Sequence, residues 1–208
     1  MADVQTSGRG RGRKKWESPK GGLWFSIILR PKVPSPRLPL LQFLAAVATQ
    51  QALEKETGLS VRLKWPNDLV LASAKLGGIL VESKTIGESV AFAILGIGLN
   101  INQGKAQLPP RAISLRLVSR KQYDLGLLLR AILDKIRSSY DDLDNPSKIM
   151  EHWWRNCIHR PLRVQVTLSK DAVIGISRAI DEDGSLLIET DDHRIRKVSE
   201  GSLRLLSG

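Results

Sequence analysis

The sequence has 208 residues, of which 42% are hydrophobic and 25% are charged, a balance that excludes a disordered chain. Its single cysteine, Cys157, excludes an intramolecular disulfide and disfavours a cysteine-based zinc site. No run approaches the ~18 consecutive apolar residues of a transmembrane helix. Because the first residues are polar and basic, without the apolar core of a signal peptide, we expect a cytoplasmic protein that does not contact membranes.

The net charge of +11 is distributed unevenly along the chain. Residues 158–208 hold 8 basic and 8 acidic side chains, so the whole excess lies in residues 1–157, with 24 basic and 13 acidic side chains. This asymmetry indicates an anionic partner for the first part of the chain. Nucleic acid, the phosphates of a nucleotide and an acidic protein surface all meet that description.

The first predicted elements are a loop, a strand and a helix. Residues 3–22 are rich in glycine and arginine and are expected to form a loop. The apolar run Leu23–Leu29 predicts a buried strand. Apolar residues at helical spacing predict a helix over Leu40–Glu56, which ends at Gly58 because glycine commonly follows the last helical turn.

Short apolar runs predict three more strands before the next helices. These strands span Val61–Trp65, Leu76–Glu82 and Val90–Leu99. Leu108–Arg120 is expected to be a loop. A long apolar stripe predicts a helix over Leu125–Leu143 with Asp124 as its N-cap, and Pro146 begins a shorter helix.

The pattern changes after Pro161. Apolar residues alternate with polar ones from Leu162 to Leu168, and the turn pair Asp183–Gly184 separates two further strand-like runs. Short strands without a helix predict a small all-β unit. We therefore expect two domains, residues 1–157 and residues 158–208.

The glycine-arginine loop offers the clearest candidate chemistry. Arginine side chains bind carboxylates and phosphates in bidentate fashion, and glycines allow backbone N–H groups to approach a phosphate. Trp16 follows the cations of Arg9–Lys15 and could stack on a base. The alternative is a flexible arginine-glycine segment with no site of its own.

Two other motifs lie at strand ends. In Lys64–Asp68, Pro66 ends a strand, so the residues after it form either a turn or part of a site. Lys75 precedes a glycine pair and could point at a ligand. Gly96–Asn102 superficially resembles a phosphate loop, but no helix follows it, so small residues lining a flat pocket fit better. The three histidines lack metal-ligand spacing and are interpreted as surface or partly buried structural residues: His152, His159 and His193.

Taken together, the motifs resemble those of the biotin protein ligases. Four of them occur in the family's order: Gln5–Arg11, Lys64–Asp68, Lys75–Glu82 and Gly96–Asn100. The resemblance implies an α+β fold, with a class II synthetase-like catalytic domain of the biotin and lipoate ligase type and a C-terminal SH3-like β-barrel. The implied β-barrel agrees with the strands predicted after Pro161.

The resemblance also implies an activity. Biotin and ATP, with Mg²⁺, would form biotinyl-5′-AMP, and the biotinyl group would then pass to a lysine of a biotin carboxyl carrier protein. It implies three catalytic residues: Arg11, Lys75 and Asp68, the last as proton acceptor or orienter unless it only holds the turn. The implied biotin-binding residues are Gln5, Gly8, Arg9, Gly10, Arg11, Lys75, Gly78, Leu80 and Gly98. The implied nucleotide-binding residues are Trp16, Asn67 and Asn100; no residue is assigned to a metal.

The sequence departs from the family pattern at its start, where an upstream strand, a biotin-binding turn and a helix are expected. A truncated, catalytically impaired homologue is therefore one alternative. A nucleic-acid-binding protein using Arg9–Lys15 is another, although no nucleic-acid-binding motif accompanies the charges. A lipoate ligase would share the fold class, and the Lys64–Asp68 and Lys75–Glu82 motifs favour biotin by resemblance. No helix-turn-helix is present, so specific DNA binding is not expected, and a homodimer is compatible with the family.

Overall fold

The computed structural model describes residues 1–87 and 89–206 and contains two five-stranded antiparallel sheets together with helices. The first sheet has the order β1-β5-β4-β3-β2. Its strands are β1 (Leu23–Leu29), β2 (Arg62–Lys64), β3 (Asp68–Leu71), β4 (Ala74–Ile86) and β5 (Ser89–Leu99). The mixed α+β class is thereby confirmed.

The glycines of the first sheet lie next to one another. β4 and β5 pair so that Gly78 is opposite Gly98 and Leu80 is opposite Gly96. A Cβ atom at Gly77 would collide with the carbonyl oxygen of Gly98, so close approach of the two strands requires glycine there. The result is a flat, side-chain-poor area in the middle of the sheet.

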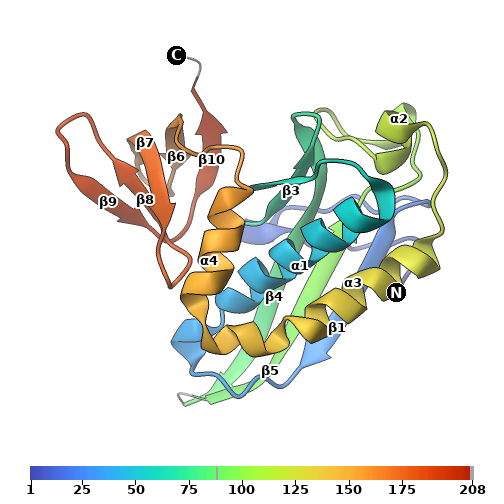
Figure 1. Ribbon diagram of the computed structural model, residues 1–208, viewed down its shortest axis with the longest axis horizontal. Helices are drawn as coiled ribbons and strands as arrows, with labels where there is room; N and C mark the ends of the chain where they lie inside the picture. Colours follow the sequence, from blue (N-terminus) through green and yellow to red (C-terminus); the bar gives the residue numbers. More distant parts are fainter. Residues whose placement is uncertain (88, 207–208) are drawn as a thin grey trace.

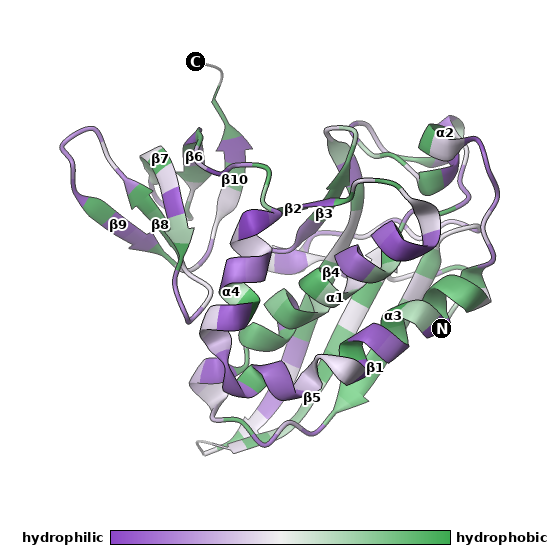
Figure 2. Cartoon of the chain, viewed as in Figure 1, coloured by the Kyte–Doolittle hydropathy of each residue, from purple (hydrophilic) through white to green (hydrophobic). Residues whose placement is uncertain are grey.

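Three helices pack on one face of this sheet (Figure 1). They are α1 (Leu40–Thr57), α3 (Leu125–Ser138) and α4 (Pro146–Arg155). Apolar residues (green in Figure 2) recur along α1, and Leu44, Leu53 and Ile132 are completely or almost completely buried in the shared core. Gly58 adopts a left-handed conformation at the end of α1, as expected for a glycine in that position. The helices leave the opposite face of the sheet for the loop at the start of the chain.

The second sheet has the order β10-β6-β7-β8-β9 and lies beside α4 (Figure 1). Its strands are β6 (Arg163–Thr167), β7 (Ala172–Ile180), β8 (Leu186–Glu189), β9 (Ile195–Val198) and β10 (Ser202–Leu205). The turn between β7 and β8 contacts the first part of the chain, because Gly184 packs against the ring of Phe43 and accepts a hydrogen bond from the Trp65 indole at 3.0 Å. This turn was predicted at Asp183–Gly184.

Several predicted elements differ from the observed ones. A short strand, β3, begins at Asp68, the last residue of the Lys64–Asp68 motif, where no strand was predicted. The expected loop Leu108–Arg120 contains a short helix, α2 (Leu115–Ser119), and the long predicted helix ends at Ser138. The remaining elements are 3-10 turns: η1 (Arg11–Arg13), η2 (Ser35–Arg37), η3 (Lys105–Gln107) and η4 (Tyr140–Asp144).

Two expectations concern single features. Asp124 is the N-cap of α3, as predicted, since its carboxylate accepts hydrogen bonds from the N–H groups of Gly126 and Leu127. The prediction for His159 was wrong in degree, because its side chain is fully buried rather than at the surface or partly buried. Within residues 1–87 and 89–206, no helix is long and apolar enough to span a membrane.

Candidate functional site

The loop at the start of the chain folds back on itself over the open face of the first sheet. The Gln5 N–H donates to the Ser18 carbonyl at 3.2 Å, and the Trp16 N–H donates to the Gly8 carbonyl at 2.9 Å. The Ser18 hydroxyl also donates to the Gln5 side-chain oxygen at 2.6 Å. A side chain at Gly8 would collide with the Trp16 carbonyl, so the close pairing of the two arms requires glycine. The arginines at the tip are therefore held over the sheet.

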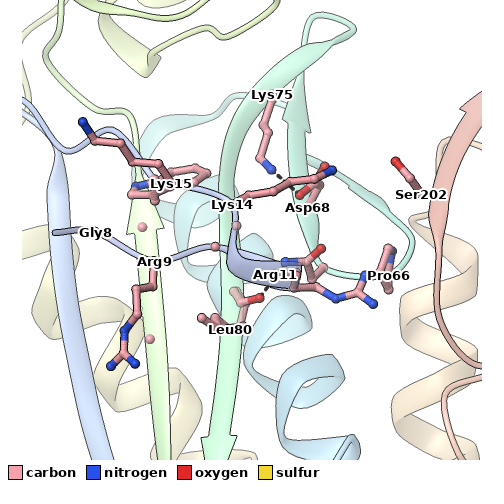
Figure 3. Close-up of a pocket in the computed structure, with 18 of the residues that line it drawn as sticks. Gly8, Arg9, Arg11, Lys14, Lys15, Pro66, Asp68, Lys75, Leu80 and Ser202 are labelled. Atoms are coloured by element: carbon pink, nitrogen blue, oxygen red, sulfur yellow. Dashed lines mark hydrogen bonds and ion pairs between the residues drawn. The ribbon is translucent and has the colours of Figure 1, made fainter. Parts of the chain in front are cut away.

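The two candidate arginines of this loop point in different directions (Figure 3). Arg9 extends along the sheet and forms an ion pair with Glu82 at 3.1 Å, with 72% of its side chain exposed. Arg11 points toward the second sheet, and its guanidinium lies 3.5 Å from the Gly201 carbonyl. Burial lowers the pKa of the Arg11 guanidinium below its usual value, and the nearby Asp68 and Glu200 carboxylates oppose that shift. Arg11 is thus a partly desolvated cation, whereas Arg9 is a surface one.

Lys75 and Asp68 form an ion pair inside the site. The Lys75 ammonium lies 2.6 Å from the Asp68 carboxylate (Figure 3). Asp68 is the first residue of β3 and Lys75 is the second residue of β4, and these two strands pair with each other. Gly78 follows on β4, and a Cβ there would contact both side chains at 3.7 Å. A larger side chain at Gly78 would therefore fill the space in front of the pair.

Trp16 lies flat against Gly98. A Cβ atom at Gly98 would lie 2.8 Å from the indole nitrogen of Trp16, which is too close for a real contact. The ring also meets Trp24 edge-on, with centroids 6.1 Å apart, and the Lys75 ammonium is 5.1 Å from its centroid. The Trp16 indole N–H is buried beside Gly98 and has no partner among the described residues.

The two candidate asparagines lie on the same side of the sheet. Asn67 donates its side-chain N–H to the Ile79 carbonyl at 2.8 Å, which fixes the Pro66–Asn67 turn to β4. Asn100 is buried just after β5, and its N–H donates to the Leu76 carbonyl at 2.8 Å. Both residues therefore form hydrogen bonds with the backbone of β4, and their contacts with a nucleotide stay predictions.

A cavity of about 880 Å³ connects these groups. A drug-sized or nucleotide-sized ligand fits a pocket of this volume. Every candidate site residue named from the sequence lines it: Gln5, Gly8, Arg9, Gly10, Arg11, Trp16, Asn67, Asp68, Lys75, Gly78, Leu80, Gly98 and Asn100. The structure thus brings together residues that are up to 95 positions apart in the sequence.

The sequence interpretation missed one wall of this cavity. Residues 167–169 and 200–203 from the second sheet also line it, and Glu200 and Gly201 lie close to Arg11. No role was predicted for any of these residues from the sequence. Glu82 belonged to a recognised motif, but its ion pair with Arg9 was not predicted. The cavity therefore lies between the two sheets.

Comparisons with known proteins agree with this arrangement. The sequence profile of the biotin/lipoate A/B protein ligase family matches residues 1–100, and that of the biotin protein ligase C-terminal domain matches residues 163–203. The bifunctional ligase/repressor BirA of Bacillus spizizenii is 33% identical over 99% of this chain, and that of Escherichia coli is 31% identical over 92%. The chain spans 65% and 61% of the lengths of these two relatives.

A solved structure shows the same fold at comparable length. The biotin protein ligase of Aquifex aeolicus, determined in complex with biotin and ATP, superimposes with a TM-score of 0.80 and 30% sequence identity. The match covers 98% of this chain and 87% of the Aquifex chain. Together with the two profile matches, this similarity shows that the chain belongs to the biotin protein ligase family.

Proposed function

We propose that this protein activates biotin with ATP as biotinyl-5′-AMP and transfers the biotinyl group to a lysine of a biotin carboxyl carrier protein. The observation that carries the proposal is the cavity between the sheets, where the cations Arg11 and Lys75 converge beside the glycine floor of β4 and β5. The Aquifex relative, which shares this fold, was determined with biotin and ATP.

The first step joins two anions, and the cavity suits it. A carboxylate oxygen of biotin attacks the α-phosphorus of ATP, a new P–O bond forms, and the bond to the β-phosphate breaks to release pyrophosphate. Arg11 and Lys75 would offset the repulsion between carboxylate and phosphate and stabilise the charge that develops on the phosphoryl oxygens. The indole of Trp16 would provide a stacking surface for the adenine.

The second step requires a neutral amine. The acceptor lysine attacks the carbonyl carbon of biotinyl-5′-AMP, the amide bond forms, and AMP leaves. A proton must leave the amine, and we assign Asp68 to receive it or to orient the amine. Lys75 holds the Asp68 carboxylate in the free protein, and the adenylate would draw the ammonium toward its own oxygens.

A Mg²⁺ ion would enter this reaction with ATP, as part of the substrate. Within residues 1–87 and 89–206, no group of three His, Cys, Asp or Glu side chains is arranged to hold a metal. Mg²⁺ at nucleotide sites is usually bound mainly by phosphates, so we assign the ion to the phosphates of ATP. The same proposal assigns residues 1–157 to the catalytic domain and residues 158–208 to the C-terminal domain.

The geometry favours the ligase over the nucleic-acid alternative. Arg11 lines the cavity and lies near Gly201, and Arg9 is paired with Glu82, so neither arginine is free of a protein partner.

Biotin-dependent exchange between pyrophosphate and ATP tests the first step alone, without a carrier protein. We expect the purified chain to exchange label into ATP only when biotin is present. Lipoate in place of biotin is the matched control and should give at least tenfold less exchange. Exchange that is independent of biotin, or stronger with lipoate, would contradict the proposal.

A further inference from the structure

The Lys64–Asp68 motif is hydrogen-bonded to a residue that does not line the cavity, His159. His159 follows α4 in the connection to β6, and its side chain is 0% exposed. The imidazole lies between the rings of Trp153 and Trp154, with centroids 5.9 and 5.8 Å away. The Ser177 hydroxyl donates to the His159 carbonyl, which fixes the backbone from the side of β7. The two tryptophan rings thus pack against the imidazole and Ser177 holds the backbone, while Nδ1 of the ring has no partner among the described residues.

The imidazole has one bond that bears on the site. The backbone N–H of Trp65 donates to Nε2 of His159 at 3.2 Å. Trp65 is 1% exposed, so without the imidazole this N–H would be buried and unpaired. Pro66, the next residue, has no N–H to donate. The bond to His159 therefore pairs the last backbone N–H before Asn67, while the Gln42 side chain donates to the Pro66 carbonyl at 3.0 Å.

This bond requires a neutral imidazole. Since Nε2 accepts the hydrogen bond, the single ring proton is on Nδ1. Burial, and after it the charge of Lys64, lowers the pKa of His159 to about 3. The ring is thus neutral at physiological pH and remains an acceptor.

The segment is also held on its other sides. The Trp65 indole N–H donates to the Gly184 carbonyl at 3.0 Å, and Asn67 is bonded to Ile79 on β4. These bonds fix the indole and the far end of the turn, but neither replaces the bond at the Trp65 N–H. From there the chain reaches Asp68, whose carboxylate holds Lys75.

We propose that His159 is a positioning residue: its neutral imidazole fixes the backbone at Trp65 and thereby places Asp68 and Lys75 in the cavity. The imidazole touches no predicted ligand atom, so it acts only through the segment. The effect of His159 on catalysis rests on the proposed function, whereas the effect of His159 on the Trp65 backbone does not.

The test compares substitutions that keep or remove the acceptor. His159→Leu removes it, while His159→Gln and His159→Asn supply a carboxamide oxygen at two different reaches. His193→Leu, on the exposed β8–β9 turn, is the matched control. If His159→Leu does not fold, His159→Met takes its place, because methionine adapts to irregular cavities. Hydrogen exchange of the Trp65 amide and the kinetics of biotinyl-5′-AMP formation are then measured.

We expect His159→Leu to exchange the Trp65 amide at least tenfold faster and to lower kcat about tenfold, with KM for biotin within threefold. At least one carboxamide should restore both quantities, and His193→Leu should change neither. Equal behaviour of the leucine and both carboxamide variants would overturn the proposal, as would an unchanged Trp65 amide in His159→Leu. If the unmodified chain forms no biotinyl-5′-AMP, the proposed function fails, and amide exchange alone decides the role of His159.

Discussion

Removing the cation of the Lys75–Asp68 ion pair should damage the first reaction step severely. In Lys75→Met, Asp68 loses the ammonium 2.6 Å away and faces two incoming anions, the biotin carboxylate and the α-phosphate. Two unit charges about 4 Å apart interact by about 4 kcal/mol at an effective dielectric constant of about 20. Solvent reaches this pair, because 39% of the Lys75 side chain is exposed. We therefore expect a smaller loss of about 2–3 kcal/mol, which corresponds to a decrease of about 30- to 150-fold in kcat/KM.

The double variant Lys75→Met/Asp68→Asn separates the two causes. It removes the cation and also the uncovered carboxylate, so it should be several-fold more active than Lys75→Met alone in biotin-dependent pyrophosphate exchange. Lys84→Met, further along the same strand and exposed, is the control for the loss of one surface charge. A single variant within threefold of the unmodified protein, or a double variant no better than the single one, would refute the reasoning.

Three further predictions concern other residues. Gly98→Ala should displace Trp16, shift its fluorescence and weaken ATP binding at least tenfold. In the control variant Gly96→Ala the new Cβ has ordinary contacts, so the fluorescence should not change. Identical fluorescence spectra of the two variants would contradict this prediction. Asp124→Ala removes the N-cap of α3 and should lower the free energy of unfolding by about 1 kcal/mol in urea titrations, with no change in KM; a change below 0.3 kcal/mol would count against the cap. The pKa of His159 is about 3 in the fold and 6.5 in the unfolded chain; the unfolded state therefore binds the extra proton, and each pH unit between these values removes up to about 1.4 kcal/mol of stability as the pH falls. His159→Gln should accordingly unfold less steeply with acid than the unmodified protein, and parallel curves would contradict the burial of a neutral imidazole.

Much of the fold could be predicted because its elements have local boundaries. β1 was predicted with its observed bounds, since an apolar run lies between glycines and a proline. The helix over residues 40–57 ends at Gly58, which adopts the left-handed conformation that glycine favours. In both cases the residues that determine the element are neighbours in the sequence.

The missed elements depend on distant contacts or on too few residues. β3 has four residues and is recognisable only through its pairing with β2 and β4. The stripe predicted as one long helix continues through Tyr140 and Leu143 because both still pack toward the core, although the α-helix ends at Ser138. Apolar spacing reports which residues face the core and does not report such a break.

The candidate site shows the same limit. Its motifs were recognisable because each is a short run of specific residues, such as Lys64–Asp68. The wall formed by the second sheet was missed, because the bond between Arg11 and Gly201 spans 190 positions and leaves no local pattern. The hydrogen bond between His159 and Trp65 was missed for a similar reason. A single histidine in a connecting segment forms no sequence pattern that would indicate its partner 94 positions away.

The central claim is that this chain transfers biotin through the cavity that contains Arg11 and Lys75. Incorporation of labelled biotin into a purified carrier domain, with ATP and Mg²⁺, tests it most directly. The account predicts ATP-dependent label on the acceptor lysine with the unmodified chain, and a loss of at least tenfold with Lys75→Met but not with Lys84→Met. A folded chain that transfers no biotin, or a Lys75→Met variant that transfers it at the unmodified rate, would contradict the account.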